Sequence, residues 1–76
     1  MSTQLSIEDQ IAELSEYIEC IKKHNCEPKK TSCCVSGGLQ WKNGTLQQCY
    51  YIELFFLCGY YENTERFDAW LNVPQV

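Results

Sequence analysis

The chain is short of the residues on which several common functions depend. It has a single histidine, His24, and no two of its six cysteines show the C-x2-C spacing of common zinc sites. No lysine or arginine occurs before Lys22. The longest apolar run, residues 49–58, is only about half as long as a membrane-spanning helix, which needs about 20 residues. These absences argue against a common zinc finger, a histidine-rich active site and a membrane protein.

The length and net charge of the chain indicate how many domains it has and what kind of partner it binds. Seventy-six residues with 45% hydrophobic content predict a single domain, residues 1–76, near the size at which one core is marginally stable. Ten acidic residues against six basic ones give a net charge of −4. Direct binding to nucleic acid needs a positive face, so we expect none. An acidic chain instead favours a protein partner with a basic surface.

The N-terminal residues predict a compartment. The first ten, MSTQLSIEDQ, contain neither the basic nor the apolar region of a secretory signal. We therefore expect a cytoplasmic protein, in the host cytoplasm if a virus encodes it. In that reducing environment the six cysteines are expected to be free thiols or metal ligands rather than disulfides.

A helix is predicted over residues 6–24. Ser6 resembles an N-cap, and Asn25 can adopt the left-handed conformation that ends a helix. Apolar residues recur at spacings of four and three residues and form one stripe: Ile7, Ile11, Leu14, Ile18 and Ile21. On this helical projection Cys20 points away from the stripe.

The opposite side of this helix is acidic. Its carboxylates are Glu8, Asp9, Glu13, Glu16 and Glu19. An ordinary exposed helix mixes both signs of charge, and like charges at these spacings cost stability. A solvated surface is the plainest interpretation. The functional interpretation is a surface that binds a basic partner, with carboxylates that imitate the phosphates of a nucleic acid.

The middle of the chain predicts a loop and then strands. Residues 25–38, which contain Pro28, Lys29-Lys30 and Gly37-Gly38, indicate a long connection with a short strand at residues 32–35. Residues 39–61 are expected to form a hairpin and core strands, because Asn43-Gly44 is typical of a two-residue hairpin turn. Residues 48–58 fit a helix nearly as well, but their aromatic and β-branched content favours a strand.

A last helix is predicted over residues 64–72, with Phe67, Trp70 and Leu71 on its buried face. The expected fold class is therefore α+β. An N-terminal amphipathic helix packs on a small antiparallel sheet of about three strands, and a short C-terminal helix follows.

The only candidate metal site consists of Cys20, His24, Cys26 and either Cys33 or Cys34. Cys20 and His24 are neighbours on a helix, and zinc would need two further ligands from the following loop. Scattered free thiols are favoured over this arrangement, and we expect no cofactor, with zinc as the alternative. A Cys–His nucleophilic pair would rest on His24 alone, with no third group to orient it, so we expect no enzyme.

Aromatic residues offer a second candidate binding surface. A sheet covered by helices on one face leaves aromatic side chains exposed on the other, and tyrosine and tryptophan often anchor protein interfaces. The candidates are Trp41, Tyr51 and Tyr61.

The C-terminal sequence CGYYENTERFDAWLN resembles the end of small zinc-ribbon restriction-alleviation proteins, although their paired C-x2-C motifs are missing. No site or function follows from this resemblance. By analogy of size and composition, the leading hypothesis is a non-enzymatic inhibitor of the anti-restriction or anti-CRISPR type, encoded by a virus or mobile element. It would occlude a basic, nucleic-acid-binding surface of a host protein. The alternatives are a zinc-stapled structural or regulatory module and a thiol redox protein.

Overall fold

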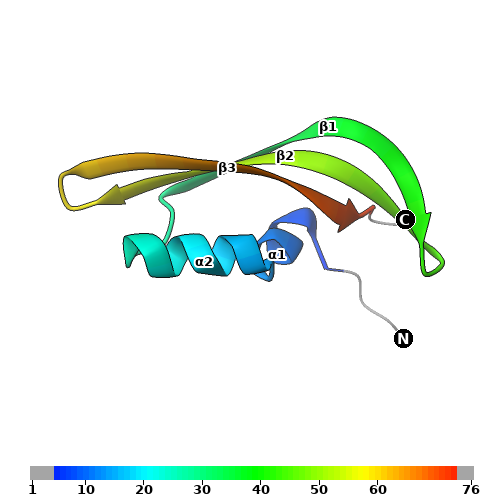
Figure 1. Ribbon diagram of the computed structural model, residues 1–76, viewed down its shortest axis with the longest axis horizontal. Coiled ribbons are helices and arrows are strands. Elements are labelled where there is room, and N and C mark those ends of the chain that lie inside the picture. Colours follow the sequence, from blue (N-terminus) through cyan, green and yellow to red (C-terminus); the bar gives the residue numbers. More distant parts are fainter. Residues whose placement is uncertain (1–4, 74–76) are drawn as a thin grey trace.

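The computed structural model describes residues 5–73 and consists of two short helices on one face of an antiparallel sheet (Figure 1). The three strands have the order β1-β2-β3, so β2 is central. The elements are α1 (Ile7–Ala12), α2 (Ser15–His24), β1 (Lys30–Lys42), β2 (Thr45–Cys58) and β3 (Tyr61–Asn72). Within the described residues no helix has the length and apolar character that crossing a bilayer requires.

The predicted architecture is wrong in two respects. The N-terminal helix is not continuous, because α1 has only six residues and ends before Leu14. The C-terminal helix over residues 64–72 does not exist, since β3 occupies this segment. Sheet, rather than helix, dominates the described part of the chain, with 57% strand and 23% helix.

The break between the helices changes which residues face the sheet. Leu14 has an extended backbone (φ −68°, ψ 141°) and precedes α2. After this break Tyr17, Cys20 and Ile21 pack against the core, whereas Ile18 is 42% exposed. The predicted single stripe is therefore wrong for Ile18, and Cys20 points toward the sheet rather than away from it.

Both predicted ends of the helical region are confirmed. The Ser6 hydroxyl accepts a hydrogen bond from the Asp9 amide (3.1 Å) and caps α1. Asn25 follows α2 with a left-handed backbone (φ 55°). The broken helical segment between these two residues therefore begins and ends where the local sequence indicates.

The predicted loop over residues 25–38 is wrong from Lys30 onward, because β1 begins there and pairs with β2. The short strand expected at residues 32–35 lies within β1. The register shifts between Val35 and Leu39, where β1 contains extra residues. Gly37 lies inside this bulge, and a Cβ atom on it would be 3.0 Å from Cys49 Cβ, so a larger residue at this position would crowd Cys49.

Two tight turns connect the strands. Asn43 (φ 52°) and Gly44 (φ 76°) both have positive φ, as a type I′ turn requires, which confirms the predicted hairpin. Gly59 (φ 69°) precedes Tyr60 in the second turn, where positive φ at the first position is typical of type II′. This turn leads into β3, which therefore pairs with β2 as a strand.

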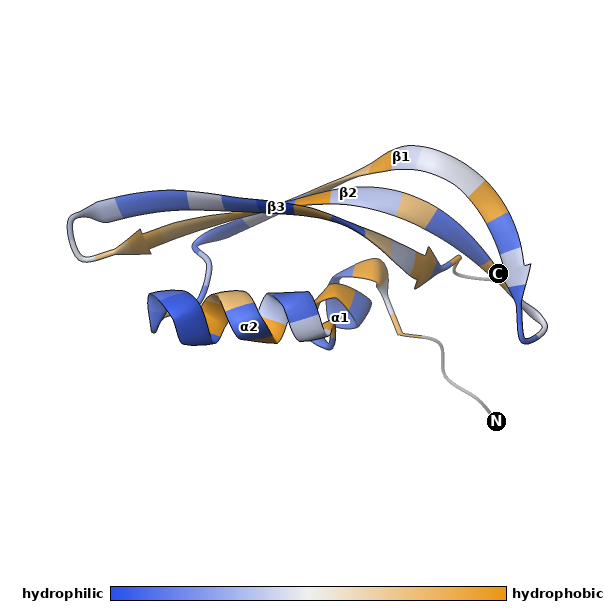
Figure 2. Ribbon diagram, in the orientation of Figure 1, coloured by the Kyte–Doolittle hydropathy of each residue, from blue (hydrophilic) through white to orange (hydrophobic). Residues whose placement is uncertain are grey.

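The core lies between β2 and the helices. The strand interpretation of the central run is confirmed, because alternate residues of β2 are buried: Ile52, Leu54 and Phe56 are all 0% exposed. Ile11 of α1 and Ala69 and Leu71 of β3 complete the buried cluster. Figure 2 shows that the C-terminal end of β2, residues 54–58, is hydrophobic, whereas the first half of β3 beside it is mainly hydrophilic. The apolar residues between the buried ones face away from the helices.

A disulfide joins Cys26, just after α2, to Cys58 at the end of β2. The two cysteines are 32 residues apart in the sequence, and their Cα atoms are 6.2 Å apart. The expectation of free thiols is therefore wrong for this pair. Cys20, Cys33, Cys34 and Cys49 are free. The bond holds the C-terminal end of the helical segment against the sheet.

We expect Phe56→Ala to lower the free energy of unfolding by about 2–5 kcal/mol, because it leaves a cavity beneath the helices. Leu57→Ala is the matched control, since Leu57 is the next residue, points to the opposite face and is 38% exposed. Urea unfolding followed by circular dichroism measures both changes. Equal losses in the two variants would contradict a core on one face only.

We also expect a reductant to lower the free energy of unfolding by about 2–4 kcal/mol, because reduction releases a closed loop of the unfolded chain. The measurement is urea unfolding with and without a phosphine reductant. A Cys26→Ser/Cys58→Ser variant should match the reduced protein and show no response to reductant. A wild type whose unfolding ignores the reductant would argue against this disulfide.

Candidate functional site

The five carboxylates of the helical region form what we call the acidic surface: Glu8, Asp9, Glu13, Glu16 and Glu19. All five are exposed. None of them belongs to an ion pair within residues 5–73, where the acidic partners are Glu53 and Glu65. Glu8 and Asp9 lie in the first turn of α1 and Glu16 in the first turn of α2. The partial positive charge of a helix N-terminus stabilises carboxylates there.

The helix break spreads these carboxylates around the helices. Glu8 lines a groove between the helices and β1, together with Ile11, Ala12, Tyr17 and Thr31. Glu16 and Glu19 line a separate pocket between α2 and β3. The acidic surface therefore extends from the β1 side of the helices to their β3 side and is not one straight stripe.

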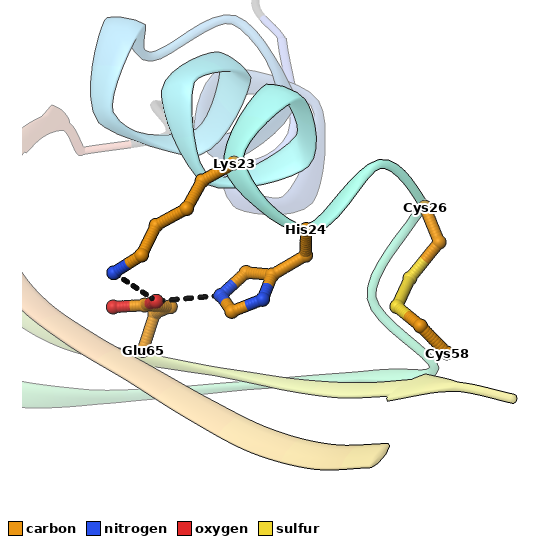
Figure 3. Close-up of polar contacts among 5 residues, drawn as sticks. All are labelled: Lys23, His24, Cys26, Cys58 and Glu65. Atoms are coloured by element: carbon orange, nitrogen blue, oxygen red, sulfur yellow. Dashed lines mark hydrogen bonds and ion pairs between the residues drawn. A yellow bond between two sulfur atoms is a disulfide. The ribbon is translucent and has the colours of Figure 1, made fainter. Parts of the chain in front are cut away.

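A polar cluster connects α2 to β3 beside the disulfide (Figure 3). Glu65 Oε2 of β3 lies 2.6 Å from His24 Nε2 and 3.0 Å from Lys23 Nζ. The His24 ring also stacks on Phe56, with ring centroids 4.5 Å apart. Only 11% of the His24 side chain is exposed, so its contact with Glu65 satisfies a nearly buried polar ring. This cluster fastens the C-terminal end of α2 to the sheet.

The electrostatic surroundings shift two pKa values in this region. Hydrogen bonds from His24 and then Lys23 lower the pKa of Glu65 below its usual value, because they stabilise the ionised carboxylate. Burial raises the pKa of the Cys20 thiol, and the negative charge of Glu65 adds to the effect. Cys20 is therefore a protonated packing residue rather than an activated nucleophile.

The candidate metal ligands are not brought together. Cys26 is bonded to Cys58, His24 contacts Glu65, and Cys33 is exposed on β1. Among the described residues there is no group of three or more histidine, cysteine, aspartate or glutamate side chains placed to hold a metal ion. Cys26 is also unavailable as a thiol nucleophile while the disulfide is intact.

The three candidate aromatic residues lie in three different places. Trp41 (70% exposed) pairs with Leu46 near the β1–β2 turn, and Tyr61 (78% exposed) pairs with Cys58 at the opposite end of the sheet. Tyr51 alternates with the buried residues of β2 and so lies on the face away from the helices, where it is half-buried. These residues do not form one surface.

Sequence reasoning missed two exposed aromatic residues. Tyr60 is fully exposed at the turn after Gly59, and Trp70 of β3 is 43% exposed on the face that carries Tyr51. The signal for Trp70 was present, because Phe67, Ala69 and Leu71 alternate with Asp68 and Trp70 as in a strand.

We expect Glu65→Gln to lower the stability of the protein most at neutral pH, where the ionised carboxylate binds His24 and Lys23. A lowered folded-state pKa contributes stability that is present above the unfolded pKa, about 4.3, and is lost as the pH falls through the folded value. The difference between wild type and variant should therefore shrink below about pH 4. Urea midpoints from pH 7 to 3 measure it.

Glu62→Gln is the control for this comparison, because Glu62 is exposed on the same strand and belongs to none of the ion pairs of residues 5–73. It should change the midpoint little. A Glu65→Gln loss of the same size at pH 3 and pH 7 would show that the carboxylate charge contributes nothing.

No protein-family model, no curated protein and no solved structure matches the chain.

Proposed function

We propose that this chain is a non-enzymatic protein-binding module whose acidic surface occludes a basic, nucleic-acid-binding surface of another protein. One observation carries the proposal. The carboxylates of residues 8–19 are exposed and belong to none of the ion pairs of the described residues, and no basic residue lies among them in the sequence.

In the isolated protein the acidic surface lowers stability, and a role in binding a basic partner would account for it. Carboxylates three and four residues apart on a helix repel one another, and interleaved lysines would remove that cost. A partner groove lined by lysine and arginine supplies the missing positive charge. Such grooves bind phosphates, and exposed carboxylates offer the same sign of charge on a rigid helical support.

Size and composition support an inhibitor rather than a scaffold. A chain of 76 residues with a net charge of −4 is large enough to cover a nucleic-acid-binding groove. Association between opposite net charges is also accelerated by electrostatic steering, which helps an inhibitor compete with nucleic acid. Virus- or mobile-element-encoded inhibitors of the anti-restriction or anti-CRISPR type act in this way, and we place the chain with them by analogy.

The disulfide favours a thiol redox protein as the second candidate, ahead of a zinc-stapled module. Cys26 and Cys58 are both half-buried, and the bond joins two elements that a reduced protein could separate. A reduction potential near that of cellular thiol buffers would support this role. A much lower potential is typical of a structural disulfide and would leave the binding proposal in place.

The test is a double charge reversal, Glu13→Lys/Glu19→Lys. Both residues are exposed and lie outside the first turns of the helices, so the fold should tolerate the change. Immobilised wild-type protein is used to capture its partner from cells of its native host, and the affinity of the purified partner is then measured. We expect the variant to bind at least about tenfold more weakly, and wild-type binding to weaken as salt is raised.

Glu27→Lys/Glu62→Lys is the matched control, because both residues are exposed and lie outside the helices. Each double variant adds four positive charges to −4 and so has a net charge of 0. Loss of binding in the first variant alone would assign the contact to the acidic surface. Binding that survives both the first variant and high salt would contradict the proposal and point to Trp41, Tyr51 or Tyr61.

A further inference from the structure

The two outer edges of the sheet differ in how they are protected. Because the strand order is β1-β2-β3, β1 and β3 each have one edge that is not paired within the described chain. An unpaired edge presents backbone N–H and C=O groups to any other extended strand. Proteins usually block such edges with charged residues, proline or a covering element.

The β3 edge has this protection. Four charged residues lie along β3: Glu62, Glu65, Arg66 and Asp68. The Gln10 side chain of α1 also reaches Asn72 and satisfies both of its backbone groups. Its Nε2 donates to the Asn72 carbonyl (3.0 Å), and its Oε1 accepts from the Asn72 amide (2.7 Å). These features make β3 a poor partner for a further strand.

The β1 edge has less protection, because between Lys30 and Lys42 its one protective feature is the bulge after Val35. Residues 31–41 contain no charge and no proline, and Lys30 and Lys42 lie at the two ends of the strand. Every residue of β1 except Gln40 is exposed. The bulge after Val35 leaves residues 31–35 as a regular arm with small or β-branched side chains. Residues 31–35 therefore resemble a strand edge that can pair with another strand more than a protected edge.

We propose that β1 pairs antiparallel with β1 of a second copy, about a two-fold axis that passes beside Cys33. Thr31 then lies opposite Val35 of the second copy, and Ser32 opposite its Cys34. The two three-stranded sheets become one continuous sheet, with the helices of both copies on the same face. In this register Lys30 meets no lysine, because the residue opposite it is Ser36.

Val35 explains why this register is favoured. It shares the helix-side face with Thr31, since their β2 partners Tyr50 and Leu54 both pack into the core, yet it is 60% exposed. Thr31 lines the groove that Ile11, Ala12, Tyr17 and Glu8 also form. Directly opposed side chains of an antiparallel pair are about 5 Å apart. Val35 of each copy is therefore placed at the mouth of the groove of the other.

A second copy fits this edge better than a strand of another protein because the pairing is symmetric. About one two-fold axis, Val35 of each copy covers the groove of the other copy. The residues that meet are small and uncharged, so the arm does not repel its own image.

The test measures the oligomeric state by sedimentation equilibrium from about 1 µM to about 1 mM, because edge pairing alone gives a weak dimer. We expect wild-type protein to shift from a mass of 8.9 kDa to twice that value as its concentration rises. Val35→Glu should raise the dissociation constant at least about tenfold, since it directs a carboxylate toward the groove that Glu8 of the other copy lines. Thr64→Glu adds the same charge to β3 as the control and should leave the dimer unchanged.

A second measurement uses native thiols. In a Cys34→Ser background, a short bis-maleimide should link two copies through Cys33, which lie opposite each other in this register, and Cys33→Ser should abolish the product. A wild type that remains monomeric overturns the proposal and leaves the edge to a strand of another protein. A dimer that Val35→Glu does not weaken, or one that Thr64→Glu weakens equally, also overturns it.

Discussion

Burial of one row of β2 is the constraint on which the rest of the structure depends. Ile52, Leu54 and Phe56 are removed from solvent by the two helices, which cover a single face of the sheet. The helices are too short to cover that face completely. The ten residues of α2 extend about 15 Å. The 14 residues of β2 extend about 45 Å. Both ends of the sheet therefore keep exposed apolar residues, Leu39 and Trp41 at one end and Tyr60 and Tyr61 at the other.

Because the helices cover only part of the sheet, contacts besides apolar packing are needed to attach them to it. The apolar contribution of α2 comes from half-buried residues, since none of its side chains is fully buried. The contact of His24 with Glu65 and the disulfide from Cys26 to Cys58 both act at its C-terminal end. At the other end of the helical region, Gln10 of α1 binds the backbone of Asn72. Polar and covalent contacts thus hold the helices in place, and the five carboxylates of the acidic surface take part in none of the ion pairs of residues 5–73.

Local signals in the sequence predicted local features well. The alternation in residues 46–58, the Asn43-Gly44 turn, the Ser6 cap and the end at Asn25 each depend on neighbouring residues and were confirmed.

The features that were missed depend on distant contacts. The break at Leu14 lets Tyr17 and Ile21 pack on the sheet, and β1 is a strand because β2 pairs with it. The spacing of Phe67, Trp70 and Leu71 fitted a helix, but pairing with β2 makes this segment a strand. Six cysteines allow fifteen disulfide pairings, so the bond from Cys26 to Cys58 could not be deduced. For the site, exposure of the five carboxylates was predicted, whereas the separation of the three aromatic residues required the register.

The two proposed contacts use different parts of the molecule and respond to salt in opposite directions. Pairing through β1 would leave four carboxylates of the acidic surface uncovered, because only Glu8 lines the groove beside β1. With the helices of both copies on one face, a dimer of net charge −8 (−4 and −4) presents its carboxylates on that side. Like charges on the two copies oppose the dimer, and salt relieves this repulsion. Attraction to a basic partner is screened by the same ions. High salt therefore favours the dimer while it weakens the partner complex, and the two associations are distinguishable even though one chain makes both.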